Sequence, residues 1–308
     1  MLNNPILEDL INRIEGDLTG GALSTSIAVA ESFIRLLSST EPKRIRDSIY
    51  NFAIEVMSHS PTMASVMNFF NGVARILECE RNTKERLKSF AEQFIGVSRS
   101  SAAASAFIAQ ILISNNDRIF LYSCSETVLE TLNKAVEDGK HVEVISAQSY
   151  ITGEGNEVID FLESKGIGYK LIPEIALAIG IQNSYKVLVG ADSITSDGFL
   201  VNKLGTYLVA LVSREMKIPF IVISSTTKFN PINEAMLKHI DIRLSDRNRS
   251  IVPVPMFDRT PLHLVTKLVT EKGVMNSDEI SSALKKNRST QLFKIWWEKS
   301  REGVAHGK

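Results

Sequence analysis

The chain has 308 residues, of which 44% are hydrophobic and 23% charged, as in a soluble globular protein of one or two domains. Lys plus Arg equals Asp plus Glu at 35 each, so no net charge draws the chain to nucleic acid or to a membrane. Cys79 and Cys124 are the only cysteines, which argues against a disulfide framework and fits a reducing, cytoplasmic setting. No apolar run reaches the roughly 18 residues of a membrane span. With five His and no Cys pair, we expect no metal and no cofactor.

The first third of the chain predicts helices. Ile6, Leu10 and Ile14 follow one another at helical spacing, as do the apolar residues of four further segments. The Ser- and Ala-rich residues 98–109 predict another helix that joins this part to the rest. We therefore expect a helical domain over residues 1–112. The four segments are residues 22–37, 44–57, 62–78 and 83–95.

From residue 113 onward the pattern alternates between short strands and helices. Short strands joined by crossover helices predict a parallel sheet that is covered on both faces. We therefore expect a doubly wound, mostly parallel, Rossmann-like α/β domain over residues 113–308. Its strands should cover residues 118–122, 141–146, 169–172, 187–189, 219–223 and 251–254, and its helices residues 126–137, 157–164 and 207–215.

Two features of this region bear on function. No G-x-G-x-x-G pattern follows the first strand, which argues against a dinucleotide-dependent oxidoreductase. The tail contains the adjacent Trp296 and Trp297, for which packing of a helix end on its own domain is favoured over a role as a partner anchor.

Polar residues gather around the predicted strand over residues 187–189. Asp192 stands just past the end of this strand, and Asn202, Lys203 and Lys228 follow. Ligands of open α/β sheets bind at the carboxyl ends of the strands, so these side chains suggest a small, phosphorylated ligand. The alternative is a surface turn, which Asp192 would cap, followed by a buried helix.

Five blocks of sequence resemble one known family. The resemblance is to the family that joins the alpha, beta and delta regulatory subunits of translation initiation factor 2B with ribose-1,5-bisphosphate and 5-methylthioribose-1-phosphate isomerases. The blocks keep the family's order and spacing from about residue 113 to 285. They are GADSI at 190–194, NKLGT at 202–206, TKFNP at 227–231, PMFDRTP at 255–261 and TEKGV at 270–274.

The resemblance implies a ligand site between the helical and α/β domains. In the isomerases a Cys and an Asp move the protons, and several Arg hold the phosphates. Asp192 matches the catalytic Asp. The residues that match ligand contacts are Gly20, Gly21, Asn202, Lys203 and Lys228.

The chain departs from the isomerases at the reaction centre. Ser123 stands at the position of the catalytic Cys, and Cys124 follows one residue late, where we expect an unreactive thiol on the opposite face of the strand end. A hydroxyl is a far weaker acid than a thiol with a pKa of ~8.5. The three phosphate-binding Arg correspond to Thr19, Ser60 and Ser149. Each loss removes charge-assisted hydrogen bonds worth roughly 1.5–3 kcal/mol.

We therefore expect a regulatory or assembly protein that acts through protein contacts and keeps a degenerate sugar-phosphate pocket. The alternative is an aldose–ketose sugar-phosphate isomerase, for which Asp192 is the main support. The resemblance implies partners such as translation initiation factor 2 and a homo-oligomer built from the α/β domains, with no direct nucleic-acid or membrane contact. The apolar surface of that oligomer would be Tyr207, Leu208, Leu211 and Val212.

Overall fold

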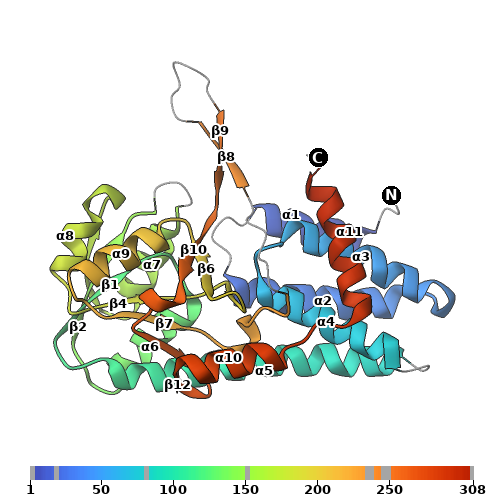
Figure 1. Cartoon of the computed structure of the whole chain (residues 1–308), viewed down its shortest axis with the longest axis horizontal. Helices are drawn as coiled ribbons and strands as arrows, with labels where there is room; N and C mark the ends of the chain where they lie inside the picture. Colours follow the sequence, from blue (N-terminus) through green and yellow to red (C-terminus); the bar gives the residue numbers. More distant parts are fainter. Residues whose placement is uncertain are drawn as a thin grey trace.

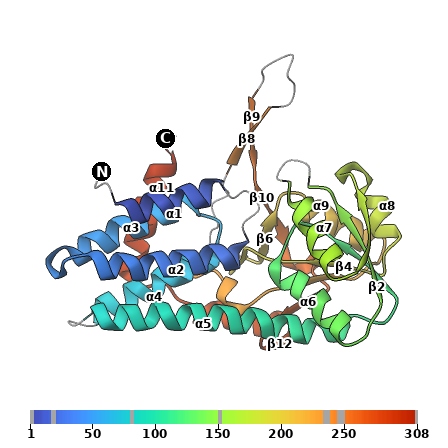
Figure 2. The same ribbon diagram turned by 180° about the vertical axis from the view of Figure 1, so that it is seen from behind.

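A helical part and an α/β part lie side by side, and the long helix α5 runs along both (Figures 1 and 2). This arrangement is that of a computed structural model, which describes residues 4–16, 21–79, 83–149, 153–232, 239–243 and 251–305. Both ends of the described chain lie on the side of the helical part. The two predicted halves are therefore both present, and a surface is available between them.

The helical part is organised around phenylalanine rings. Phe69 meets the rings of Phe33 and Phe70 edge-on, with 5.3 Å between ring centroids in each pair. Such edge-to-face pairs favour burial of the apolar faces of the helices against one another. The elements are α1 (Pro5–Gly16), α2 (Ala22–Ser39), η1 (Pro42–Arg44), α3 (Ile45–His59), α4 (Ala64–Cys79), α5 (Lys84–Ala109) and η2 (Gln110–Leu112).

Helix α5 is one continuous element of 26 residues where the sequence predicts two shorter helices. Gly96, between the two predicted segments, does not interrupt it. With η2, α5 is long and apolar enough to cross a membrane by length and composition alone, and 33% of its most apolar window is buried. Core helices of soluble proteins meet the same test, and α5 packs on α2, α6 and β11. It thereby ties the two parts together.

The last helix, α11 (Gln291–Ala305), returns to the helical part. Phe293, Trp296 and Trp297 are buried in the same cluster as Phe33 and Phe69. The two Trp thus pack within the chain, but on the helical part and not on the α/β part to which the boundary at residue 112 assigned them. The division into two domains remains our proposal, with α11 placed in the helical one.

A seven-stranded sheet forms the centre of the α/β part, in the order β12-β11-β7-β4-β1-β2-β3. Every neighbouring pair is parallel except β11–β12, which confirms the predicted fold class. The strands are β1 (Asp117–Leu121), β2 (Val142–Ala147), β3 (Gly168–Ile172), β4 (Lys186–Val189), β7 (Phe220–Ile223), β11 (Lys267–Thr270) and β12 (Gly273–Met275).

Both faces of the sheet are covered by helices. Successive side chains of a strand point to opposite faces, so Ile119 and Leu121 join one hydrophobic cluster and Phe120 the other. This double burial explains why the strands read as short, continuous apolar runs. The elements between the strands are α6 (Glu126–Glu137), α7 (Glu154–Ser164), η3 (Glu174–Ala176), α8 (Leu177–Gln182), α9 (Thr206–Glu215), η4 (Thr226–Lys228) and η5 (Leu262–Leu264), and α10 (Ser277–Lys286) follows the last strand.

Two small antiparallel sheets lie outside the main one. Strands β5 (Ser193–Thr195), β6 (Phe199–Lys203) and β10 (Phe257–Pro261) form the first. Strands β8 (His239–Arg243) and β9 (Ile251–Pro255) form a hairpin that projects from the body (Figure 1). The strand predicted over 251–254 is therefore present but does not join the parallel sheet. Its two Pro lack a backbone N–H and suit an edge strand.

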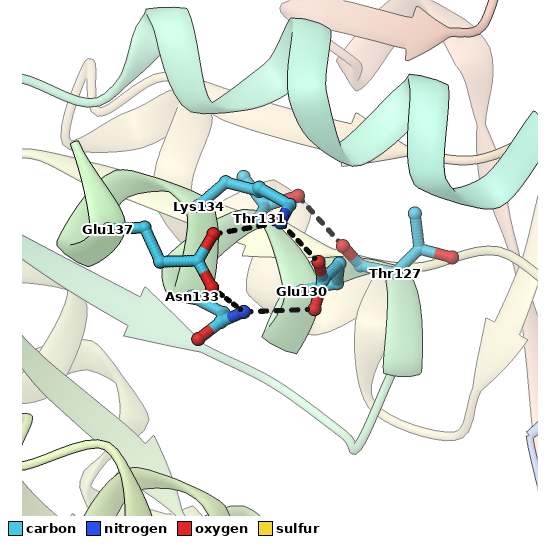
Figure 3. A network of polar contacts seen from close by, with 6 residues as sticks. All are labelled: Thr127, Glu130, Thr131, Asn133, Lys134 and Glu137. Carbon is cyan, nitrogen blue, oxygen red and sulfur yellow. Dashed lines mark hydrogen bonds and ion pairs between the residues drawn. The ribbon is translucent and has the colours of Figure 1, made fainter.

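Helix α6 leads from the carboxyl end of β1 and carries a polar network on its surface (Figure 3). Lys134 Nζ lies 2.8 Å from Glu137 Oε2 and 3.2 Å from Glu130 Oε1, and Asn133 donates to both carboxylates. Surface pairs of this kind contribute a few tenths of a kcal/mol each. They help to hold the helix whose first turn borders the pocket described below.

Candidate functional site

A pocket opens between the helical part and the carboxyl ends of the central strands. Residues that follow β1, β2, β4 and β7 form one wall, and α1, α2 and the connection between α3 and α4 form the other. Ligands of open α/β sheets bind at this edge because the crossover connections leave a crevice there. This location between the two parts is the one that the family resemblance implies.

The predicted site residues come together in this pocket. All of them line it except Gly20, which lies outside the described residues. The lining members of the set are Gly21, Ser123, Asp192, Asn202, Lys203 and Lys228.

Asp192 and Lys228 are two buried side chains of opposite charge that do not form a direct ion pair with each other. The Asp192 backbone is fixed by the bond from its N–H to the carbonyl of Val201 (2.9 Å) and by the bond that its carbonyl accepts from the N–H of Ala64 (3.1 Å). Burial raises the pKa of the Asp192 carboxyl group, against the attraction of Lys228 and Lys203. Burial likewise lowers the pKa of Lys228. Neither side chain has a hydrogen bond or ion pair to another described residue.

Glu154 is a pocket residue that sequence analysis missed and that the structure places at the centre of a hydrogen-bond network. Its side chain is only 1% exposed, and its carboxylate accepts hydrogen bonds from Ser123 Oγ (2.7 Å) and the Cys124 backbone N–H (3.1 Å). The other carboxylate oxygen forms an ion pair with the Lys203 ammonium group. Lys203, predicted to meet a ligand, is thus already engaged with a carboxylate of the chain itself.

The position of Glu154 follows from local backbone geometry. Gly153, with φ +74°, precedes the first residue of α7, and Gly155 packs so closely that a Cβ would lie 2.3 Å from the Gln148 carbonyl oxygen. The sequence predicted that this helix begins at Glu157, so Glu154 seemed to belong to a loop. The two Gly around an acidic residue were the signal that a helix start lies here.

Ser123 and Cys124 both line the pocket, and Cys124 also packs against one hydrophobic cluster of the sheet. Strand β1 ends at Leu121, and Ser123 has φ +66°, so the alternation of a strand no longer applies. Burial raises the pKa of the Cys124 thiol to about 12, aided by Glu157 and Glu154. The thiol is therefore protonated at neutral pH.

The positions that carry phosphate-binding Arg in the isomerases do not all reach the pocket. Ser60 lines it, and its buried Oγ has no hydrogen-bond partner. Ser149 is not among the lining residues, and Thr19 lies outside the described part of the chain. Arg13 and His59 also line the pocket and were not predicted. His59 Nε2 lies 3.2 Å from Glu15 Oε1.

The block at 255–261 lines the pocket through Met256 and Phe257 and also supports the other residues of the site. Asp258 accepts hydrogen bonds from the backbone N–H groups of Gly205 (2.7 Å) and Tyr207 (3.1 Å) at the start of α9. The Phe257 ring lies under the Lys203 ammonium group, 5.4 Å from it. The block thus fixes both the start of α9 and the cation that holds Glu154.

We expect Asp258 to make the stability of the protein depend on pH. Burial raises the pKa of this carboxyl group from 3.8 to about 6. The folded state therefore binds the proton more tightly than the unfolded state, and this contribution to stability is lost as the pH rises through about 6. Urea unfolding between about pH 4 and pH 7 should show a steeper loss of stability in wild type than in Asp258→Asn. Equal slopes for the two proteins would contradict the assignment.

Among the residues that the structure describes, no group of three His, Cys, Asp or Glu side chains is placed to hold a metal ion. The chemistry of the pocket therefore has to be argued from its carboxyl, ammonium and hydroxyl groups.

Comparison with known proteins gives one family. The model of the initiation factor 2 subunit family matches residues 19–277. The chain is 33% identical over 279 residues to a translation initiation factor eIF-2B subunit 2-like protein of Pyrococcus horikoshii, covering 89% of this chain and 98% of the relative. It is also 30% identical over 230 residues to a ribose 1,5-bisphosphate isomerase of Methanocaldococcus jannaschii, covering 71% and 74%.

Solved structures agree with this result. The translation initiation factor eIF-2B of Pyrococcus horikoshii superposes with a TM-score of 0.82 at 32% identity, over 89% of this chain and 98% of that chain. A chain of the tetrameric eIF2B-beta2-delta2 complex of Chaetomium thermophilum gives 0.71 at 19% identity, over 91% and 94%, which shows the shared fold. Since named relatives include both initiation factors and isomerases, the pocket has to decide between the two functions.

Proposed function

Since the chain belongs to the initiation factor 2 subunit family, we propose that it is a regulatory or assembly protein of the translation initiation factor 2B type. It acts through protein contacts, in the cytoplasm, and not as a sugar-phosphate isomerase. Translation initiation factor 2 or related proteins are its expected partners.

The observation that carries this proposal is the state of the proton-transfer position. The Ser123 hydroxyl already donates a hydrogen bond to Glu154, and a hydroxyl ionises far less readily than a thiol. The neighbouring Cys124 thiol, with a pKa of about 12, is also protonated at neutral pH. An aldose–ketose shift needs two groups that exchange protons near neutrality, and here the partner of Asp192 is missing at this position.

Charge in the pocket argues in the same direction. An isomerase of a bisphosphate must neutralise two phosphate groups, for which Arg is suited by its two parallel N–H donors. At the positions of the family's Arg this chain has Thr19, Ser60 and Ser149. The Lys203 ammonium group is paired with Glu154. We therefore expect singly phosphorylated ligands to bind with Kd no tighter than roughly 0.1–1 mM.

One observation favours the isomerase as a second candidate. The pKa of the Asp192 carboxyl group is raised by burial, and catalytic acids and bases are tuned toward neutrality in this way. Buried ion pairs that have no catalytic role shift pKa values as well, so turnover has to be measured.

The deciding experiment is an NMR assay of purified protein with ribose 1,5-bisphosphate and 5-methylthioribose 1-phosphate. We expect no product above the buffer control from wild type, Asp192→Asn or Ser123→Cys. Positioning of the substrate supplies ~7–11 kcal/mol of rate acceleration, so the Cys alone should not restore turnover without Thr19→Arg, Ser60→Arg and Ser149→Arg. If wild type turned over either substrate and Asp192→Asn abolished this activity, the protein would be an isomerase and the proposal would be wrong.

We further propose that the chain forms a homo-oligomer through an apolar surface on η3, α8 and α9, in which α8 packs against both η3 and α9. Ile175 is 95% exposed, Ile179 63%, Leu208 51% and Tyr207 40%. Leu211 and Val212, which the sequence added to this surface, pack partly against the core of the sheet. Neighbouring exposed apolar side chains are characteristic of interaction sites, and the related Chaetomium complex is tetrameric.

Light scattering at micromolar concentration should give a dimer or a larger assembly. The variants Ile179→Glu and Leu208→Glu should shift it toward monomer, because each would place a charge in an apolar interface. Val274→Glu is the matched control, since Val274 is exposed on β12, away from α8 and α9. A monomeric wild type would count against the oligomer, and equal effects of all three variants would count against this surface.

A further inference from the structure

The Glu154 carboxylate lies in a cradle of hydrogen-bond donors. Its oxygens receive a hydroxyl proton from Ser123, a backbone N–H from Cys124 and the ammonium group of Lys203. A hydroxyl, a backbone N–H and an ammonium group are also the donors that bind a phosphate oxygen. The chain thus places one of its own anions where an anionic ligand group would be held.

The rest of the pocket presents polar groups without partners. The Asp192 carboxylate and the Lys228 ammonium group lack a direct hydrogen bond or ion pair to another described residue, and the buried Ser60 Oγ has none either. Lys228 is only 6% exposed, so bulk water does not easily compensate its charge. These groups are the ones left to meet a ligand.

We infer that Glu154 acts as the built-in anion of this pocket and makes it selective for neutral polyhydroxylated ligands, such as sugars or nucleosides, over their phosphate esters. This inference rests on the proposed function, because it concerns a pocket that binds without turning over. Glu154 is thereby a residue that determines specificity, and no motif of the sequence had pointed to it.

The chemistry of the two ligand classes explains the selectivity. A phosphate ester that approached the cradle would meet the Glu154 carboxylate at close range, and like charges in a partly buried site repel strongly. A hydroxyl group can donate to the Asp192 carboxylate and accept from Lys228 or Ser60. Neutral hydroxyls therefore satisfy these groups without adding charge to a pocket in which Asp192 faces Lys228 and Glu154 is paired with Lys203.

The test is calorimetry at low salt and neutral pH with three probes: ribose, ribose 5-phosphate and inorganic phosphate. Wild type should bind ribose more tightly than ribose 5-phosphate and should give no heat with inorganic phosphate. Glu154→Gln removes the carboxylate that pairs with Lys203 and should tighten phosphate binding by roughly tenfold or more. Asp160→Asn is the matched control, because it removes one exposed carboxylate from the same helix and should leave all three affinities unchanged.

Glu154→Gln leaves the Lys203 ammonium group buried without the Glu154 carboxylate, which destabilises the folded state. A second variant that removes both charges therefore serves as a control for misfolding. Glu154→Gln with Lys203→Gln removes both charges and should show no gain in phosphate binding. The inference is overturned if wild type prefers ribose 5-phosphate, if it does not bind ribose, or if the two variants bind phosphate equally. The isomerase assay and light scattering are independent of these results, so failure here is separable from failure of the proposed function.

Discussion

Gly205→Ala should destabilise the protein by about 2–6 kcal/mol, the sum of backbone strain and steric overlap. Gly205 has φ +100°, a conformation that side-chain-bearing residues rarely adopt. An added Cβ would also lie 1.9 Å from the Tyr122 hydroxyl oxygen and 2.7 Å from Cζ of the same ring. Tyr122 cannot move away easily, because its hydroxyl donates to the Leu204 carbonyl at 2.7 Å and its ring is buried.

The matched control for this change is Gly198→Ala. Gly198 also has positive φ, +91°, but an added Cβ would have no atom within 4 Å. It should cost about 1 kcal/mol from strain alone. Urea unfolding of both variants separates the two causes, and Tyr122→Phe in the Gly205→Ala background should recover part of the loss. Equal losses for the two Gly variants would show that the contact with Tyr122 does not matter.

Phe69→Ala should cost about 3–5 kcal/mol, as expected for removal of a fully buried ring that leaves a cavity. The Phe69 ring has no exposed surface and contacts four other aromatic rings, those of Phe33, Phe70, Phe90 and Phe94. Surrounding helices can close such a cavity only in part, because the other rings are held by their own neighbours.

The control for the aromatic core is Phe107→Ala, at an exposed position of α5. Phe107→Ala should change the free energy of unfolding by no more than about 0.5 kcal/mol, because the exposed ring buries little apolar surface in the folded state. Urea unfolding followed by far-ultraviolet circular dichroism measures both variants. Similar losses at the two positions would mean that Phe69 is not the centre of the helical core.

Local pattern predicted much of the fold correctly. The helix over residues 126–137 was predicted with the bounds that α6 shows, and five of the parallel strands were placed to within one or two residues. The strands β5, β6, β8, β10, β11 and β12 were missed. They have three to five residues each, which is too short for a period to emerge.

Of the pocket residues, the sequence could predict mainly those that follow the parallel strands. Asp192 and Lys228 stand just past apolar strands, and parallel strands bring their carboxyl ends to one edge, so their proximity follows from topology. Glu154 and Asp258 gave no comparable signal. Their roles depend on which donors lie within hydrogen-bond distance, and those donors come from other elements.

By itself, the sequence determined the family, the order of helices and strands, and the residues available to the pocket, because motifs and hydrophobic periods are local properties of the chain. Only the tertiary structure decided that Lys203 is paired with Glu154, that Cys124 remains protonated, and that α11 packs on the helical part. Pairing and burial depend on the approach of segments far apart in the chain. Charge and pKa in this pocket are therefore properties of the fold and not of any single motif.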